Sequence, residues 1–208
     1  MRGLVVGAHL RREDIVAPCE PMPMRGLFLS SVPIAADQNL ADRELVLRVA
    51  AARDLLLAQA TFVAIRYGFA AWSAEEAEAK CAGHLEAWRS LLTAHRDHVE
   101  MTLRIVAETP AERPDRRDFS SGAEYLKALH VASRSAAVAP DFRARVESGL
   151  VPLAVDHRWL NRDEKSLELV LLVRRDRVAE VRAAGEELRG MSTPFLLSGP
   201  WPLEAFAE

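Results

Sequence analysis

Residues 99–106 read VEMTLRIV, and residues 108–118 shortly after them read ETPAERPDRRD. Apolar and polar side chains alternate through the first stretch, which is typical of a strand with one buried face. The second stretch is polar and carries two prolines, as linkers between domains often do. Together they predict a strand followed by a domain boundary, with an N-terminal domain at 1–107 and a C-terminal domain at 108–208.

The N-terminal part is predicted to mix strands and helices. Short apolar runs at 3–6 and 26–32 indicate two strands, and the proline-bearing CEPMPM at 19–24 indicates a turn between them. From Asp42 onward apolar residues recur at helical spacing among strong helix formers, which predicts a helix. The β-branched and aromatic TFVAIRY at 61–67 predicts a buried strand.

Two S-x-x-E motifs, Ser73–Glu76 and Ser121–Glu124, mark further helix starts because they have the form of a capping box. The second helix is broken or kinked by Pro140. Behind the first motif one apolar stripe predicts a single helix that ends near His95. Its members are Ala77, Cys81, Leu85, Trp88 and Leu92.

The last part of the chain predicts two more strands, a helix and a final strand. Residues 153–160 and 167–173 are predicted as neighbouring strands joined by a polar loop. Asp176 is predicted to cap a helix that ends at Gly190, and a last strand follows at 194–197.

Each half therefore contains a few strands with helices that would cover one face of a sheet. The predicted fold class is α+β, with two tandem ferredoxin-like α/β-sandwich domains and a C-terminal tail.

Composition excludes several classes of partner. The 208 residues are 50% hydrophobic and carry a formal net charge of −3, and the sequence pI of about 6.1 lacks the basic footprint of a nucleic-acid-binding domain. No apolar run approaches the length of about 18 residues that spans a bilayer, and the N-terminus lacks a signal-peptide core. Cys19 and Cys81 lie far apart and predict reduced thiols. We expect a cytoplasmic protein with no nucleic-acid or membrane partner.

The best metal candidates are His95, His98 and Glu100, because histidines three apart on a helix face the same way. They lie where a helix should end, and its dipole favours polar or cationic residues there, so a structural role is the preferred interpretation. Cys81 and His84 are also three apart, but Cys81 belongs to the apolar stripe. We predict no metal and no cofactor.

Motifs for catalysis are absent: the sequence has no G-x-S-x-G, G-x-G-x-x-G or G-x-x-x-x-G-K-[ST]. His157 on a predicted strand can act as a base, although a partly buried structural histidine is the preferred interpretation. These residues therefore identify no catalytic site.

Trp201 stands out near the end of the chain, within Gly199-Pro-Trp-Pro202. The prolines stiffen the backbone, and the indole is a large aromatic anchor. Such a side chain can plug the C-terminal domain or engage a partner.

Four stretches resemble the gas vesicle synthesis family F/L (GvpF/GvpL). FVAIRYG at 62–68 is similar to the family's LPVRFGTVF strand, and HVEM at 98–101 to its VEWGVKV. GAEYL at 122–126 resembles the G-x-x-YL helix start, and LLSGPWP at 196–202 is similar to the ending LTGPWPPYSF.

The resemblance implies a non-enzymatic accessory protein of gas vesicle assembly with two domains related to the ferredoxin-like fold. Family members are thought to contact the small hydrophobic shell protein, to help nucleate or line the shell, and to meet other accessory proteins. The candidate partner-binding residues are Arg66, Tyr67, Gly68, Gly199, Pro200 and Trp201.

Two other hypotheses stay open at this stage. One is a small-ligand or metal-binding sensor or enzyme on a ferredoxin-like scaffold, with His157 or the pair His95 and His98 as working groups. The other is a scaffold that joins further accessory proteins through the same surfaces.

Overall fold

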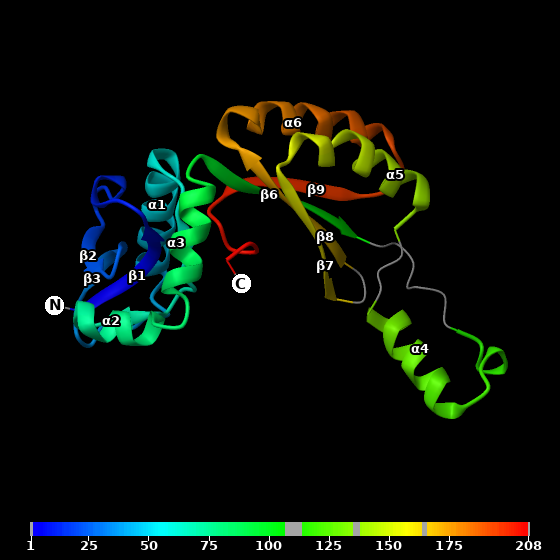
Figure 1. Ribbon diagram of the computed structural model, residues 1–208, viewed down its shortest axis with the longest axis horizontal. Helices are drawn as coiled ribbons and strands as arrows, with labels where there is room; N and C mark the ends of the chain where they lie inside the picture. The colour runs from blue at the N-terminus through cyan, green and yellow to red at the C-terminus, as the bar shows by residue number, and fades with distance from the viewer. Residues whose placement is uncertain (1, 107–113, 135–137, 164–165, 208) are drawn as a thin grey trace. The chain divides into compact units, whose positions relative to one another are not determined.

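The computed structural model describes residues 2–106, 114–134, 138–163 and 166–207. Within these ranges the chain forms a mixed α/β fold with two antiparallel sheets and six α-helices (Figure 1). None of these helices is long and apolar enough to cross a membrane. The chain divides into two compact units: Met1–Val99 together with Trp201–Glu208, and Glu100–Pro200.

The sheet of the first unit is built around β1, which forms from the apolar run near the N-terminus. Its strands are β1 (Arg2–His9), β2 (Glu20–Met24), β3 (Leu27–Ile34), β4 (Val63–Ala64) and β5 (Ala70–Ala71). Their order is β2-β3-β1-β4, and β5 pairs with β1. The strands predicted at 3–6 and 26–32 are thus confirmed.

The predicted turn at 19–24 is wrong, because most of that segment forms the edge strand β2. Pro21 pairs with Ser30 and Pro23 with Phe28 in an antiparallel register. Prolines lack an N–H, but two prolines two residues apart can both face the open edge of a sheet. The pairing with β3, which is not visible in the local pattern, makes these residues a strand.

Helix α1 (Arg43–Gln59) confirms the predicted helix. The Asp42 carboxylate accepts from the Glu44 amide at 3.0 Å and caps the N-terminus. Its buried residues join the core that contains Leu4 and Val6 of β1; they are Leu45, Val49, Ala52 and Leu56.

The single helix predicted from Ser73 is divided into α2 (Ala74–Cys81) and α3 (Leu85–Ala94). The Ser73 hydroxyl caps α2 by accepting from the Glu76 amide at 3.2 Å, as the capping box predicts. The apolar stripe continues through both helices, since Cys81 and Trp88 are both buried. A stripe therefore does not reveal a break between two helices that bury the same side.

Both faces of the first sheet are buried. Along β3, Leu29 and Val32 point to opposite faces, and each is exposed by 1% or less. A two-layer sandwich covers one face of its sheet only. The ferredoxin-like arrangement predicted for this half is therefore not confirmed.

The segment predicted as a strand at 61–67 is buried from Thr61 to Val63 and at Ile65 but is largely irregular. Only Val63 and Ala64 form β4, while the Ile65 amide still donates to the Val6 carbonyl at 3.1 Å. Gly68 then turns the chain with a φ of +98°, a value that favours glycine.

The second unit contains the other sheet and three α-helices. Its strands are β6 (His98–Val106), β7 (Asp156–Asp163), β8 (Ser166–Arg174) and β9 (Phe195–Trp201), in the order β7-β8-β6-β9. Its helices are α4 (Gly122–Arg134), α5 (Pro140–Gly149) and α6 (Val178–Glu187). β7 and β8 pair antiparallel, which confirms the two neighbouring strands predicted before residue 174.

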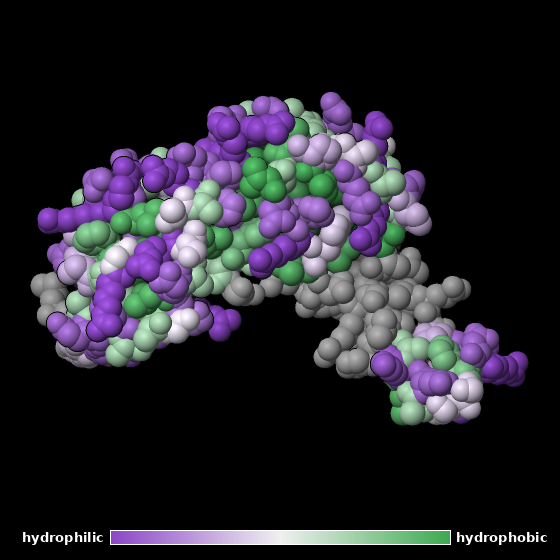
Figure 2. All heavy atoms as spheres, in the orientation of Figure 1, coloured by the Kyte–Doolittle hydropathy of each residue, from purple (hydrophilic) through white to green (hydrophobic). Residues whose placement is uncertain are grey.

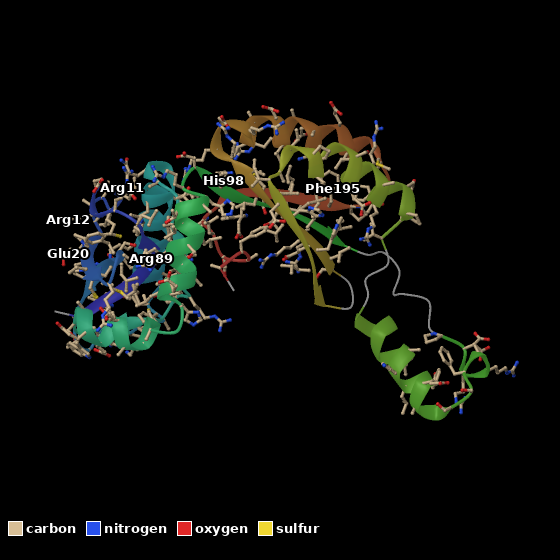
Figure 3. All side chains as sticks on the ribbon, viewed as in Figure 1. Arg11, Arg12, Glu20, Arg89, His98 and Phe195 are labelled. Atoms are coloured by element: carbon tan, nitrogen blue, oxygen red, sulfur yellow. The ribbon has the colours of Figure 1, made fainter. Side chains whose placement is uncertain are left out.

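The core of the second unit gathers α5, α6 and one face of the sheet (Figure 1). Met101 and Leu171 from the sheet meet Phe142 of α5 and Val181 of α6 in one buried cluster. Phe195 of β9, labelled in Figure 3, lies at the edge of this core with its ring centroid 5.7 Å from that of Phe142.

Helix starts in this unit differ from the predictions in two places. Pro140 begins α5 as its first residue, where a proline fits because its missing N–H would have no partner in the helix. The predicted cap by Asp176 is wrong: α6 begins after Arg177, and Asp176 lies in a 3-10 turn before it. The ion pair of Asp176 with Arg174, at 2.6 Å, engages its carboxylate instead.

Helix α4 makes a small local cluster. It begins at the predicted capping box, where the Glu124 amide donates to the Ser121 hydroxyl at 3.1 Å. Tyr125 lies beside Phe119 with 5.9 Å between ring centroids, whereas Leu126 is 63% exposed. Figure 2 accordingly shows hydrophobic atoms on the surface of this helix.

Five 3-10 turns complete the described elements: Arg12–Asp14, Arg116–Asp118, Val151–Leu153, Arg175–Arg177 and Leu188–Gly190. The last of these follows α6 and ends at the glycine that the sequence identified as a stop. The final strand is longer than predicted, since β9 continues through Gly199 and Pro200 to Trp201.

The two compact units differ from the predicted domains 1–107 and 108–208. β6, which the sequence placed at the end of the first domain, is an interior strand of the second sheet. The residues after Pro200 belong to the first unit by their contacts. Residues 107–113 of the predicted boundary lie outside the described residues.

Candidate functional site

The end of the chain pairs with the segment that follows α1. The Leu203 amide donates to the Phe62 carbonyl at 2.9 Å, and the Ala64 amide donates to the Leu203 carbonyl at 2.8 Å. Val63 and Leu203 form a parallel bridge. We call Trp201–Ala207 the tail and the edge of β4 that receives it the tail site.

The tail is held by apolar side chains as well as by its backbone. Leu203 is fully buried, Ala205 is 8% exposed and Phe206 is 7% exposed. Trp201 is 48% exposed. Within the tail it is thus residues after Trp201 that are buried, while about half of Trp201 faces solvent.

Arg53 of α1 strengthens the same region. Its guanidinium donates to the Ile65 carbonyl, directly after β4. Burial lowers the pKa of Arg53, and the negative charge of Glu204 in the tail opposes that shift. Arg53 therefore connects α1 with the residue after β4 by a hydrogen bond and interacts with Glu204 of the tail through charge.

The predicted triad 66–68 divides into one exposed and two structural residues. Arg66 is exposed, whereas the Tyr67 hydroxyl donates to the Leu40 carbonyl at 2.6 Å and its ring packs against the core. A Cβ on Gly68 would meet nothing within 4 Å, so its positive φ is the reason for glycine there.

Gly199 and Pro200 lie on β9 where it runs beside β6. Gly199 has a φ of +118°, and a Cβ there would lie 2.9 Å from the Glu100 carbonyl oxygen. Its own carbonyl accepts from Arg182 at 2.8 Å. A larger residue at 199 would push β9 away from β6, which gives this glycine an architectural role.

The structure pairs Leu203 in the tail with residues 62–64 but separates the exposed side chains of Trp201 and Arg66. In the parallel register of Val63 with Leu203, Trp201 precedes the paired residues and Arg66 follows them. The two side chains thus lie toward opposite ends of the paired stretch.

A second candidate surface, which the sequence analysis missed, lies on the outer side of α1. Leu47 is 58% exposed, Leu55 is 50% exposed and Val46 is 41% exposed. Ala51 lies between Leu47 and Leu55, so the three share one stripe at a spacing of four residues. We call Val46, Leu47, Ala51 and Leu55 the outer face of α1.

Signs of this face were present in the sequence. RELVLRVAAARDLLLAQ has apolar residues on both sides of the helical wheel, whereas a surface helix normally has one apolar stripe. Only the stripe that faces the core was needed to predict this helix. In α1 one apolar face is buried in the core and the other is exposed.

The metal and catalytic candidates do not assemble into a site. The His95 and His98 rings meet edge to face with centroids 5.1 Å apart, but no group of three or more His, Cys, Asp or Glu in the described part of the chain is arranged to hold a metal ion. His157 is exposed on β7 rather than partly buried.

The two thiols are poor nucleophiles. Burial raises the pKa of Cys19 to about 11 and also raises that of Cys81, where Lys80 partly opposes it. Both cysteines are free and buried, which agrees with the reduced thiols expected from the sequence.

Known structures share this fold. The chain is similar to the crystal structure of gas vesicle protein GvpF from Microcystis aeruginosa, with a TM-score of 0.74 and 10% identity, covering 100% of this chain and 99% of that one. It is also similar to GvpF from Anabaena sp. PCC7120, with a TM-score of 0.68 and 12% identity, covering 100% and 97%. No curated protein matches the sequence.

These structures are only 10% and 12% identical to the chain and show its fold, whereas its family is shown by the sequence. Residues 25–208 match the family described as gas vesicle synthesis protein GvpL/GvpF. The match begins just before β3 and includes α1, β4 and the tail, which are the elements of both candidate surfaces. The chain therefore belongs to the GvpL/GvpF family of gas vesicle synthesis proteins.

Proposed function

We propose that this protein is a non-enzymatic accessory protein of gas vesicle assembly, which binds the small hydrophobic shell protein and helps to nucleate or line the shell. Membership of the GvpL/GvpF family supports the role in assembly. The protein would act in the cytoplasm and at the gas vesicle, and other accessory proteins would be further partners.

The outer face of α1 is the observation that carries this proposal. Its leucines are half exposed or more, with Leu47 at 58% and Leu55 at 50%. An apolar shell subunit needs a partner that removes its surface from water before the shell closes, and burial of apolar area supplies that free energy. A helix can offer such a stripe to an apolar helix of the partner.

Trp201 and Arg66 are proposed as further contacts in the first unit. The half-exposed indole supplies a large apolar surface of the kind that dominates interfaces. Arg66 is exposed on the loop held by Tyr67 and Gly68, while Gly199 and Pro200 set the course of the chain into Trp201. In this proposal Arg66 and Trp201 contact the partner, and the other four candidate residues hold them in position.

The finer fold prediction is retained for the second unit only. We propose that this unit is ferredoxin-like: β6, α5, β7, β8, α6 and β9 follow the order strand, helix, strand, strand, helix, strand, and α4 is an additional helix between β6 and α5. The sheet order β7-β8-β6-β9 and the joint core of α5 and α6 support this connectivity.

Co-expression with the small shell protein of the same genome tests the function. We expect the shell protein to stay soluble and to co-purify with this chain. In the variant Leu47→Lys/Leu55→Lys, retention should fall at least about ten-fold, because apolar anchors each contribute about 1 kcal/mol or more. The control Leu196→Lys changes a leucine of the second unit that is 62% exposed and should retain the partner.

The possible outcomes distinguish a wrong function from a wrong binding surface. If the wild-type chain neither solubilises nor captures the shell protein, shell binding is wrong. If the wild type captures it and the α1 variant does so equally, the partner binds elsewhere, and Trp201→Ala becomes the next variant. Circular dichroism of each variant confirms that the fold is intact.

A further inference from the structure

The tail is attached to one unit and bound by the other. The chain passes between the units twice, at 99–100 and again at 200–201. After the second passage, the buried contacts of Leu203 and Phe206 are made within the first unit. Such a segment makes the same contacts whether the first unit belongs to its own chain or to another copy.

The tail site has a defined chemistry. The Phe62 carbonyl and the Ala64 amide receive an extended segment in parallel, through the two hydrogen bonds of Leu203. The bound segment supplies a leucine, a small residue two positions later and then a phenylalanine, all buried. This is strand addition in which main-chain bonds and side-chain burial act together.

The opposite edge of this sheet differs. β2 lies at that edge with Pro21 and Pro23 two residues apart. A proline that faces the edge offers no N–H to an added strand, and edges protected in this way resist pairing between chains. Strand addition to the first sheet is thus directed to β4.

We propose that the tail exchanges between copies of this chain, so that the tail of one copy occupies the β4 edge of a second copy. The segment that binds in trans is the same tail that the tail site binds in the structure. Its hydrogen bonds and buried side chains are therefore the same in the exchanged form. The connection at 200–201 then joins the second unit of one copy to the first unit of the next. Reciprocal exchange closes a dimer, and one-way exchange builds a longer chain.

Disulfide trapping between two differently tagged full-length chains tests this exchange. One chain carries Val63→Cys, the other carries Leu203→Cys, and both carry Cys19→Ala and Cys81→Ala. Paired strands lie about 4.8 Å apart, within the Cα separation of about 4.4–6.8 Å that a disulfide accepts. Neither chain can form this bond alone, so a product near twice 23.0 kDa that carries both tags reports a tail bound in trans.

Two controls calibrate the trap after co-expression and mild oxidation. The double variant Val63→Cys/Leu203→Cys shows that the pair can close. The pair Val63→Cys with Ser192→Cys, an exposed residue of the second unit, measures chance collisions. We expect the trapped product at least about ten-fold above that level, since docking raises the effective concentration of the tail. A yield at the collision level overturns the exchange.

A second measurement covers the case in which a cysteine variant fails to fold. The unsubstituted full-length chain is followed by light scattering over a concentration series. We expect the fraction of a multi-copy species to rise with protein concentration. The variant Leu203→Asp, which places a charge at the buried position of the tail, should abolish this species. A chain that stays monomeric up to its solubility limit contradicts the proposal.

Discussion

Helices α1 and α6 each bury one apolar face, but they turn different surfaces outward. At the same spacing, α1 presents Leu47, Ala51 and Leu55, whereas α6 presents Ala179, Ala183 and Glu187. The outer side of α6 is further charged by ion pairs at its ends, between Arg177 and Glu180 and between Arg189 and Glu186. A helix of this fold can therefore be stable with a polar outer side. The apolar outer face of α1 is not a requirement of packing.

The sharpest test within α1 uses two neighbouring leucines. Leu56 is fully buried and Leu55 is 50% exposed. Leu56→Ala should lower the free energy of unfolding by about 2–5 kcal/mol, because it leaves a cavity. Leu55→Ala should change it by less than about 0.5 kcal/mol. Urea denaturation measures both, and a large loss for Leu55→Ala would show that the outer face stabilises the fold after all.

The second test concerns His9, a buried histidine of the first unit. His9 is fully buried on β1, stacks on Phe62 with ring centroids 5.1 Å apart, and has its Nε2 2.9 Å from the Ser30 hydroxyl. Burial lowers the pKa of His9 from 6.5 to about 3. Between pH 6.5 and about 3, His9 is therefore protonated in the unfolded chain and neutral in the folded chain.

The sign of the pH effect follows from that difference. The stability contribution is fully present above pH 6.5 and is lost as the pH falls from 6.5 toward 3. At pH 5 the loss is about 2 kcal/mol. His9→Gln, which stays neutral, should reduce the change in unfolding free energy between pH 7.5 and pH 5 by that amount.

The third test compares how the two helices begin. Asp42 caps α1 by accepting from the Glu44 amide, whereas Arg177 at the start of α6 makes no capping hydrogen bond. Asp42→Ala should cost about 1 kcal/mol of stability. Arg177→Ala should cost less than about 0.5 kcal/mol, since it removes an exposed ion pair. Equal losses in thermal denaturation would indicate that the cap contributes little to α1.

Local patterns in the sequence predicted most elements of this fold. The Ser73 and Ser121 capping boxes began helices as predicted, because a capping box acts within one turn. The failures depended on distant residues. β2 is a strand because β3 pairs with it in spite of its prolines, and the break between α2 and α3 leaves the apolar stripe intact.

The candidate site shows the same division. The resemblance pointed to segments 66–68 and 199–201, and the structure explains the shapes of Gly68 and Gly199 by their positive φ values. The return of the tail to β4 could not be predicted, since it joins residues about 140 positions apart through two backbone bonds and buried side chains. The outer face of α1 is present in the sequence as a second row of apolar residues, but the buried row alone is enough to predict the helix.

The last test has the smallest expected effect and asks whether an apolar stripe is enough. Ala179→Leu/Glu187→Leu copies the pattern of Leu47, Ala51 and Leu55 onto α6. All changed residues are exposed, so stability should shift by less than about 0.5 kcal/mol. If the shell protein recognises α1 with the loop and tail beside it, the copied stripe should not restore shell-protein retention to the Leu47→Lys/Leu55→Lys variant. Restored retention in the co-expression assay would mean that exposed leucines on any helix attract the partner, and the difference between α1 and α6 would then be one of composition rather than of a built site.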